Sequence, residues 1–86
     1  MVEAKVVLKN PTGLHARPAS IFVTEAGKFK SDIFIIKDGK EVNAKSILNI
    51  LAMGAKKGDE IILKVVGEDE DQALKRLVDL LENLNE

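Results

Sequence analysis

Hydrophobic and polar residues alternate at the start of the chain, with valine, alanine or leucine at every second position from residue 2 to residue 8. A period of two predicts a β-strand that buries one of its faces. Residues 33–36 are β-branched or aromatic, and the Asp38-Gly39 pair that follows supplies the positive φ angles of a two-residue hairpin turn. The pattern therefore predicts a hairpin whose short second strand lies at 40–42.

Another strongly apolar run occupies residues 60–66 and ends at Gly67. Strands that are buried between neighbours are more continuously hydrophobic than strands at an edge, so this run predicts a fourth strand in the centre of the sheet.

Two segments carry apolar residues at helical spacing. The first follows a turn at 10–13 and stops at Gly27, with its apolar positions at Ala19, Phe22, Val23 and Ala26. The second lies near the C-terminus, with its stripe at Ala73, Leu74, Leu77, Val78 and Leu81. Asp69 and Gln72, three positions apart, predict a capping-box contact at the start of this second helix.

A third, shorter helix is predicted over residues 47–53, where Ser46 can cap the first turn and Gly54 can end the last turn in a left-handed conformation. Its apolar residues fall on two arcs, one with Ile47, Leu48 and Leu51, the other with Ile50 and Met53. One sheet cannot bury both arcs. The helix is therefore either packed between two elements or exposes an apolar patch for docking.

The expected order is strand, helix, strand, strand, helix, strand, helix, with no repeat or linker in the 86 residues. This order predicts a single α+β domain over residues 1–86, with a four-stranded sheet and three helices packed on one face. Periodicity leaves the strand order open, because several folds with a split βαβ unit share this alternation.

Composition excludes several functions. The chain has no cysteine, so it holds no disulfide, thiolate metal site or cysteine nucleophile, which suits a reducing cytoplasm. Thirteen basic and 14 acidic residues give a net charge of −1, so no overall basic field attracts nucleic acid or an anionic membrane. We expect no membrane insertion, because the apolar runs are far shorter than the roughly 18 residues that span a bilayer. The start of the chain does not have the pattern of a signal peptide.

His15 is the one histidine of the chain, and it stands where the turn-rich loop enters the first helix, two residues before Arg17. A helix N-terminus binds phosphate through its unpaired N–H groups and its partial positive charge. Pro18 has no N–H, so Ala16 and Arg17 supply the backbone donors there. A neutral imidazole can attack phosphorus, and a guanidinium suits phosphoryl oxygens. The alternative is an ordinary surface histidine at the start of a helix.

Other chemistries fit these residues poorly. A single histidine without organised carboxylate partners does not build a zinc site, so we expect no metal and no cofactor. Ser20 is predicted on a helix that runs away from His15, which argues against a serine–histidine catalytic pair. Three phenylalanines and no tyrosine or tryptophan offer few stacking platforms for nucleic acid.

Two stretches of the sequence together resemble one family. Residues 13–19, Gly-Leu-His-Ala-Arg-Pro-Ala, closely resemble the active-site motif of the HPr family, the histidine-containing phosphocarriers of the bacterial phosphoenolpyruvate-dependent sugar phosphotransferase system. Residues 43–51, Asn-Ala-Lys-Ser-Ile-Leu-Asn-Ile-Leu, resemble the regulatory serine signature of the same family. The resemblance covers essentially the whole chain.

The resemblance implies an open-faced β-sandwich with an antiparallel sheet in the order 1-4-2-3. It also implies that His15 is phosphorylated, on its pros nitrogen, by enzyme I, and that the group then passes to sugar-specific IIA domains. Arg17 and the Ala16 N–H would stabilise the phosphoryl group. Ile47, Leu48 and Leu51 would contact partners. Such a protein is a carrier and a substrate of other enzymes, and we expect a monomer in the cytoplasm.

The serine signature implies a second role. By resemblance, Ser46 is phosphorylated by an HPr kinase/phosphorylase, which weakens transfer from enzyme I and creates a ligand for a catabolite control repressor. Phosphate is compatible with a helix N-terminus, because the helix dipole favours the added negative charge. The alternative function is that of a mainly regulatory paralogue that acts through phospho-Ser46. The presence of His15 argues against it.

Overall fold

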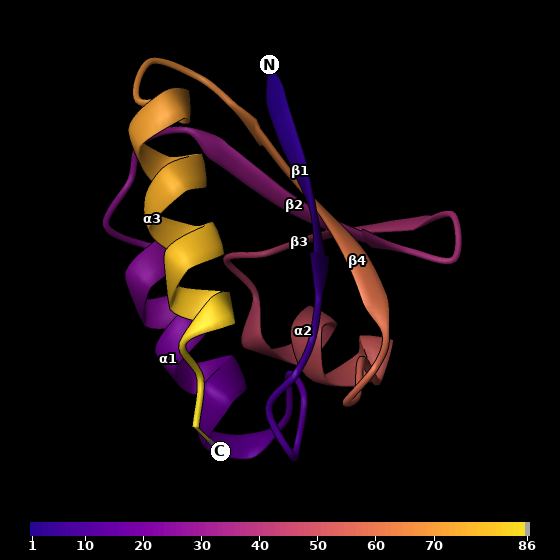
Figure 1. Cartoon of the computed structure of the whole chain (residues 1–86). Coiled ribbons are helices and arrows are strands. Elements are labelled where there is room, and N and C mark those ends of the chain that lie inside the picture. Colours follow the sequence, from indigo (N-terminus) through magenta and orange to yellow (C-terminus); the bar gives the residue numbers. More distant parts are fainter. Residues whose placement is uncertain (86) are drawn as a thin grey trace.

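The computed structural model describes residues 1–85 and shows four strands and three helices in the predicted order. The strands are β1 (Val2–Val7), β2 (Asp32–Lys37), β3 (Lys40–Asn43) and β4 (Glu60–Val66), and the helices are α1 (Ala16–Ala26), α2 (Ile47–Met53) and α3 (Glu70–Glu82). The strands form one antiparallel sheet in the order β1-β4-β2-β3, and the helices lie on one side of it (Figure 1). The predicted architecture and strand order are confirmed.

Strand β4 has the central position that its hydrophobic run predicted. It pairs with β1 on one side and with β2 on the other, so that Leu63 stands opposite both Ala4 and Ile35. Alternate β4 residues, Ile61, Leu63 and Val65, are buried beneath the helices, while the residues between them face the open side of the sheet. Strand β4 is therefore covered by the helices on one face and hydrogen-bonded to a neighbouring strand along both edges, as an interior strand is.

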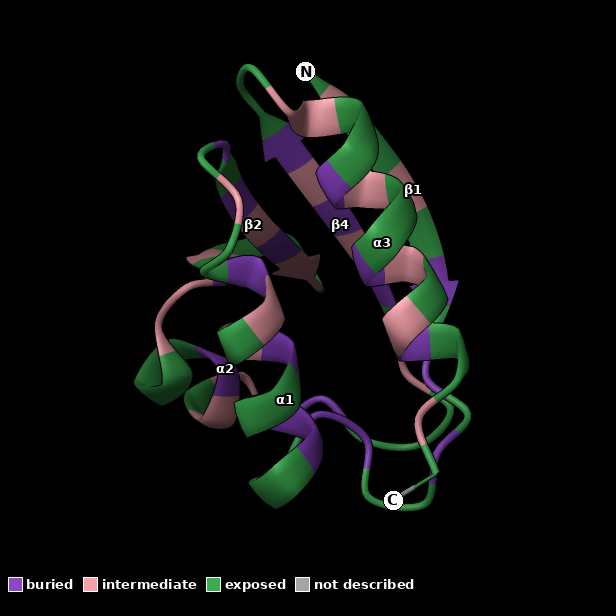
Figure 2. Ribbon diagram, turned by 90° about the vertical axis from the view of Figure 1, so that its left-hand side faces the viewer, coloured by how far each residue is buried: buried purple, intermediate pink, exposed green. Residues whose placement is uncertain are grey.

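The core lies between the sheet and the inner faces of the helices, where the buried positions appear purple in Figure 2. Helix α1 contributes Phe22, α2 contributes Ile50, and α3 contributes Leu77. Each is fully buried, with 0% of its surface exposed. The Asp38-Gly39 turn has φ angles of 51° and 81°, which confirms the predicted two-residue hairpin.

The predicted capping box at the start of α3 is wrong. Asp69 occupies the N-cap position, but its side chain makes no capping hydrogen bond. Its carboxylate instead accepts hydrogen bonds from the backbone N–H groups of Lys30 and Ser31, at 2.9 and 3.0 Å, and from the Ser31 hydroxyl. Three donors from the loop between α1 and β2 therefore outcompete the first turn of α3, and Asp69 ties that loop to the helix.

This tie leaves no room for a side chain at residue 67. A Cβ on Gly67 would lie 2.6 Å from the Ser31 hydroxyl oxygen, and the φ angle of Gly67 is +151°. The hydrogen bond from the Ser31 hydroxyl, followed by that from the Lys30 N–H, lowers the pKa of Asp69 from 3.8 to about 2. The ionised form is the one that accepts all three bonds.

The lowered pKa predicts how stability depends on pH. Because the folded-state pKa lies below the unfolded-state value, the contribution of Asp69 is complete above about pH 4 and is lost as the pH falls towards about 2. We expect Asp69→Asn to lower the free energy of unfolding at pH 7 and to flatten its decline between pH 4 and 2. Denaturant unfolding at several pH values measures both effects. Asp71→Asn, an exposed change in the first turn of α3, is the control, and equal pH profiles for the two variants would contradict the assignment.

Candidate functional site

The candidate site is a short exposed stretch held between two buried anchors. His15, Ala16 and Arg17 are exposed, while Leu14 before them and Pro18 after them are buried. His15 is the N-cap residue of α1, with extended backbone angles of −136° and 157°, and its side chain makes no capping hydrogen bond. The imidazole therefore does not cap the helix that it precedes, and its exposure makes it accessible to another protein.

Ala16 begins the helix in an unusual conformation. Its φ angle is +50°, in the left-handed region that a residue with a Cβ occupies at a cost of about 1–2 kcal/mol. Such a conformation persists only where the surroundings fix the backbone on both sides. The sequence did not reveal this feature, because alanine normally occurs in right-handed helices.

The surroundings of the His15 loop come from the segment that follows α2. The Leu14 N–H donates to the Ala55 carbonyl at 3.0 Å, and the Gly58 N–H donates to the Leu8 carbonyl at 2.7 Å. Gly13 has a φ angle of +62°, and a Cβ there would lie 2.5 Å from the carbonyl oxygen of Ala55 and from Cα of Lys56. Only glycine allows the two backbones to approach this closely. The loop is thus fixed against residues 55–58 before any partner binds.

Ser46 caps α2 as the sequence predicted. Its hydroxyl oxygen accepts a hydrogen bond from the Asn49 N–H at 3.4 Å, and Gly54 ends the helix with a left-handed φ angle of +69°. The turn before the helix is fixed as well, because the Asn43 carbonyl accepts from the Ser46 N–H at 3.2 Å. The side chain of Lys45 donates a hydrogen bond to the Phe29 carbonyl at 2.7 Å and so connects this turn to the loop between α1 and β2.

The two arcs of α2 have different environments. Ile50 is completely buried, whereas Leu48 is 75% exposed and Ile47 is 37% exposed. Leu51 is half-buried. Helix α2 packs beside α1 (Figure 2). We call Ile47, Leu48 and Leu51 the apolar patch. Ile21 of α1 is also exposed, at 41%, but it lines a separate hollow with Leu80 and Leu84.

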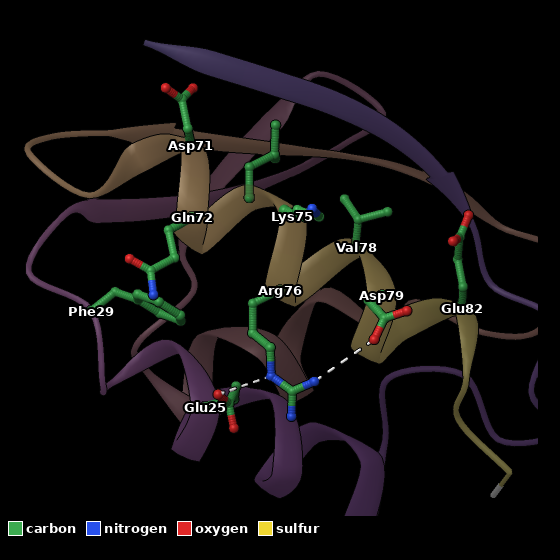
Figure 3. Close-up of a pocket in the computed structure, with 10 residues that line it drawn as sticks. Glu25, Phe29, Asp71, Gln72, Lys75, Arg76, Val78, Asp79 and Glu82 are labelled. Carbon is green, nitrogen blue, oxygen red and sulfur yellow. Dashed lines mark hydrogen bonds and ion pairs between the residues drawn. The ribbon is translucent and has the colours of Figure 1, made fainter.

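A separate hollow lies elsewhere, along the outer side of α3 and the end of α1 (Figure 3). Arg76 crosses it and pairs with Glu25 at 3.2 Å and with Asp79 at 3.7 Å. The hollow includes neither His15 nor Ser46. In the described residues, no helix is long and apolar enough to cross a membrane. The hollow along α3 is thus separate from the candidate site, whose residues 15–17 are exposed.

Comparison with known proteins agrees with this geometry. Residues 2–83 match a family model described as the PTS HPr component phosphorylation site. The chain is 51% identical over 77 residues to the HPr-like protein Crh of Bacillus subtilis, which covers 90% of this chain and 91% of Crh. It is 46% identical over 83 residues to the phosphocarrier protein HPr of Mycoplasma pneumoniae, which covers 95% of this chain and 94% of that protein.

Solved structures give the same result. The crystal structure of HPr-C-His from Thermoanaerobacter tengcongensis superposes with a TM-score of 0.94 at 51% identity and covers 95% of this chain and 92% of that one. HPr of the same organism has also been solved as a dimer, with a TM-score of 0.76, 51% identity, and 95% and 94% of the two chains covered. The open-faced sheet with its helices on one side is the fold of these HPr structures. The chain belongs to the HPr family of the phosphotransferase system.

The tight approach at Gly13 predicts an unusually costly substitution. Gly13→Ala should lower the free energy of unfolding by at least about 2 kcal/mol, because the new Cβ adds a clash with Ala55 and Lys56 to the strain of a positive φ angle. Gly54→Ala is the matched control, since Gly54 has a similar φ angle and nothing within 4 Å of its Cβ position. It should cost only about 1 kcal/mol. Equal losses in urea titrations of the two variants would contradict the proposed contact.

Proposed function

We propose that this chain accepts a phosphoryl group on His15 from phosphorylated enzyme I, which takes it from phosphoenolpyruvate, and passes it to sugar-specific IIA domains. The observation that carries the proposal is the imidazole of His15, which is exposed at the start of α1 and makes no capping hydrogen bond. Buried neighbours on both sides fix its backbone. Membership of the HPr family supports the same role.

For phosphoryl transfer, the main requirement is that the chain positions the His15 ring. A lone pair on the His15 ring attacks the phosphorus, a nitrogen–phosphorus bond forms, and the bond between phosphorus and the donor group of enzyme I breaks as its electron pair returns to that group. The resemblance assigns the attack to the pros nitrogen. Arg17 and the Ala16 N–H then balance the charge of the bound group, aided by the positive end of the α1 dipole. The second transfer reverses these steps towards a IIA domain.

A carrier must meet several partners briefly, and the apolar patch suits that requirement. Leu48 and Ile47 offer an exposed anchor on α2, a helix that packs against the helix that begins beside His15. Small interfaces of this kind bind transiently, and charges at their edge set the rate of encounter. Tight binding to a partner would slow turnover.

Ser46 gives the site a proposed control. A phosphate on Ser46 would place about two negative charges beside Ile47, at the edge of the apolar patch. An HPr kinase/phosphorylase would add this phosphate. The added charge would oppose acidic partner groups, which weakens transfer from enzyme I, and would recruit basic groups, as on a catabolite control repressor. The similarity to Crh is consistent with a mainly regulatory paralogue, but His15 favours the carrier role.

The oligomeric state and location follow from the same proposal. We expect a monomer, since a carrier needs its patch free for enzyme I and IIA domains in turn. We expect a cytoplasmic location, which the absence of cysteine suits. The existence of an HPr dimer in Thermoanaerobacter tengcongensis makes this a point for measurement, which light scattering at several concentrations provides.

The phosphoacceptor assignment predicts the chemistry of the labelled protein. Incubation with enzyme I, magnesium and labelled phosphoenolpyruvate should give protein-bound label that is labile in acid and stable in alkali. The label should be absent from His15→Ala and retained by Ser46→Ala, which is the control for attachment to serine. Undiminished labelling of His15→Ala would refute the site, and an unlabelled parent with active enzyme I would refute transport.

The regulatory proposal predicts a charge effect that can be separated from capping. Ser46→Asp and Ser46→Asn both preserve an N-cap, because aspartate and asparagine cap helices about equally well. We expect Ser46→Asp to slow transfer from enzyme I by roughly tenfold, through repulsion at the patch, while Ser46→Asn stays close to the parent. Stopped-flow transfer kinetics measure the difference. If both variants transfer at the parental rate, Ser46 does not control docking through charge.

A further inference from the structure

The loop that carries His15 contains a buried asparagine with no place in the chemistry above. Asn10 is only 3% exposed, and its side-chain Nδ2 donates a hydrogen bond to the Gly13 carbonyl at 2.8 Å. We propose that Asn10 is a positioning residue for His15, which sets the orientation of the peptide that joins Gly13 to Leu14. The inference rests on the proposed role of His15 as phosphoacceptor.

The peptide between Gly13 and Leu14 is held from both sides. Its carbonyl accepts from Asn10, while its N–H donates to the Ala55 carbonyl at 3.0 Å. Rotation of this peptide plane would break both bonds at once. Since the Leu14 side chain is also buried, with 1% exposed, the backbone that leads into His15 has one orientation.

The hydrogen bond from Asn10 adds something that the turn itself does not provide. The turn from residue 10 to residue 13 is already closed by a backbone bond from the Gly13 N–H to the Asn10 carbonyl at 3.2 Å. That bond fixes the Gly13 N–H but not the Gly13 carbonyl. The amide of Asn10 fixes the carbonyl, and so controls the next peptide, one residue before His15.

The buried amide contributes little net stability. Within the described residues, the side-chain Oδ1 of Asn10 is buried without a hydrogen-bond partner. An unsatisfied buried acceptor has lost its hydrogen bonds to water, and this cost is comparable with the gain from the single bond that Nδ2 makes. Asn10 therefore acts mainly by orienting the peptide between Gly13 and Leu14. Ala16, two residues beyond Leu14, is held at a φ angle of +50° and needs such a fixed approach.

Two substitutions test the role, with a control at the other end of the molecule. Asn10→Ala removes the amide, and Asn10→Asp replaces the donor by an oxygen that repels the Gly13 carbonyl. Ser31→Ala removes a part-buried side-chain hydrogen bond to Asp69, the N-cap residue of α3, and the start of α3 lies at the opposite end of the fold from the start of α1 (Figure 1). Each variant is compared in thermal unfolding, in amide hydrogen exchange and in phosphoryl transfer from enzyme I.

We expect Asn10→Ala to accelerate exchange of the Leu14 amide by roughly three- to tenfold relative to β4 amides, the equivalent of one neutral hydrogen bond. The kcat for transfer should fall by a similar factor. The KM should stay near the parental value, because the apolar patch is unchanged. Asn10→Asp should act in the same direction and more strongly, and Ser31→Ala should change neither Leu14 exchange nor kcat.

Parental exchange and kcat in Asn10→Ala would overturn the proposal. So would a loss of transfer that merely follows the loss of thermal stability, as judged against Ser31→Ala. A parent protein that enzyme I does not label would instead refute the carrier function. The exchange of Leu14 would still decide whether Asn10 holds the loop, so the two failures are distinguishable.

Discussion

The structure depends most on the backbone contact between residues 13–14 and residues 55–56. Glycine at position 13 lets the loop before α1 approach the carbonyl of Ala55, and the Leu14 N–H then bonds to that carbonyl. This contact joins the start of α1 to the end of α2. It thereby fixes His15 relative to the apolar patch that is proposed to dock partners. This relative position is set when the chain folds and does not depend on the binding of a partner.

A site of this kind suits a group that passes between proteins. The side chains at residues 15–17 are exposed and flanked by buried neighbours, so partners can reach the imidazole while its backbone stays fixed. The hollow along α3 is separate from this stretch, and Arg76 pairs there with Glu25 and Asp79. For the proposed phosphoryl transfer, positioning, charge balance and brief docking are what the chain must provide, because such transfer depends mainly on positioning and electrostatic stabilisation.

Local features were predictable from the sequence, and features set by distant residues were not. The Asp38-Gly39 turn and the Ser46 cap depend on neighbours within three positions, and the central place of β4 follows from its own hydrophobic run. The capping role of Asp69 was wrong because its partners lie 38 and 39 residues away. The strain at Ala16 was invisible for the same reason. The strand order followed from the family resemblance and not from periodicity.

The central claim is that the His15 loop is rigid before any partner arrives. Nitrogen-15 relaxation of the unphosphorylated protein tests it directly. The account predicts backbone order parameters of about 0.85 for Gly13, Leu14 and His15, equal to those of β4. Values below about 0.6 for these residues, with β4 rigid, would show a mobile loop that is ordered only by its partners, and would contradict the account.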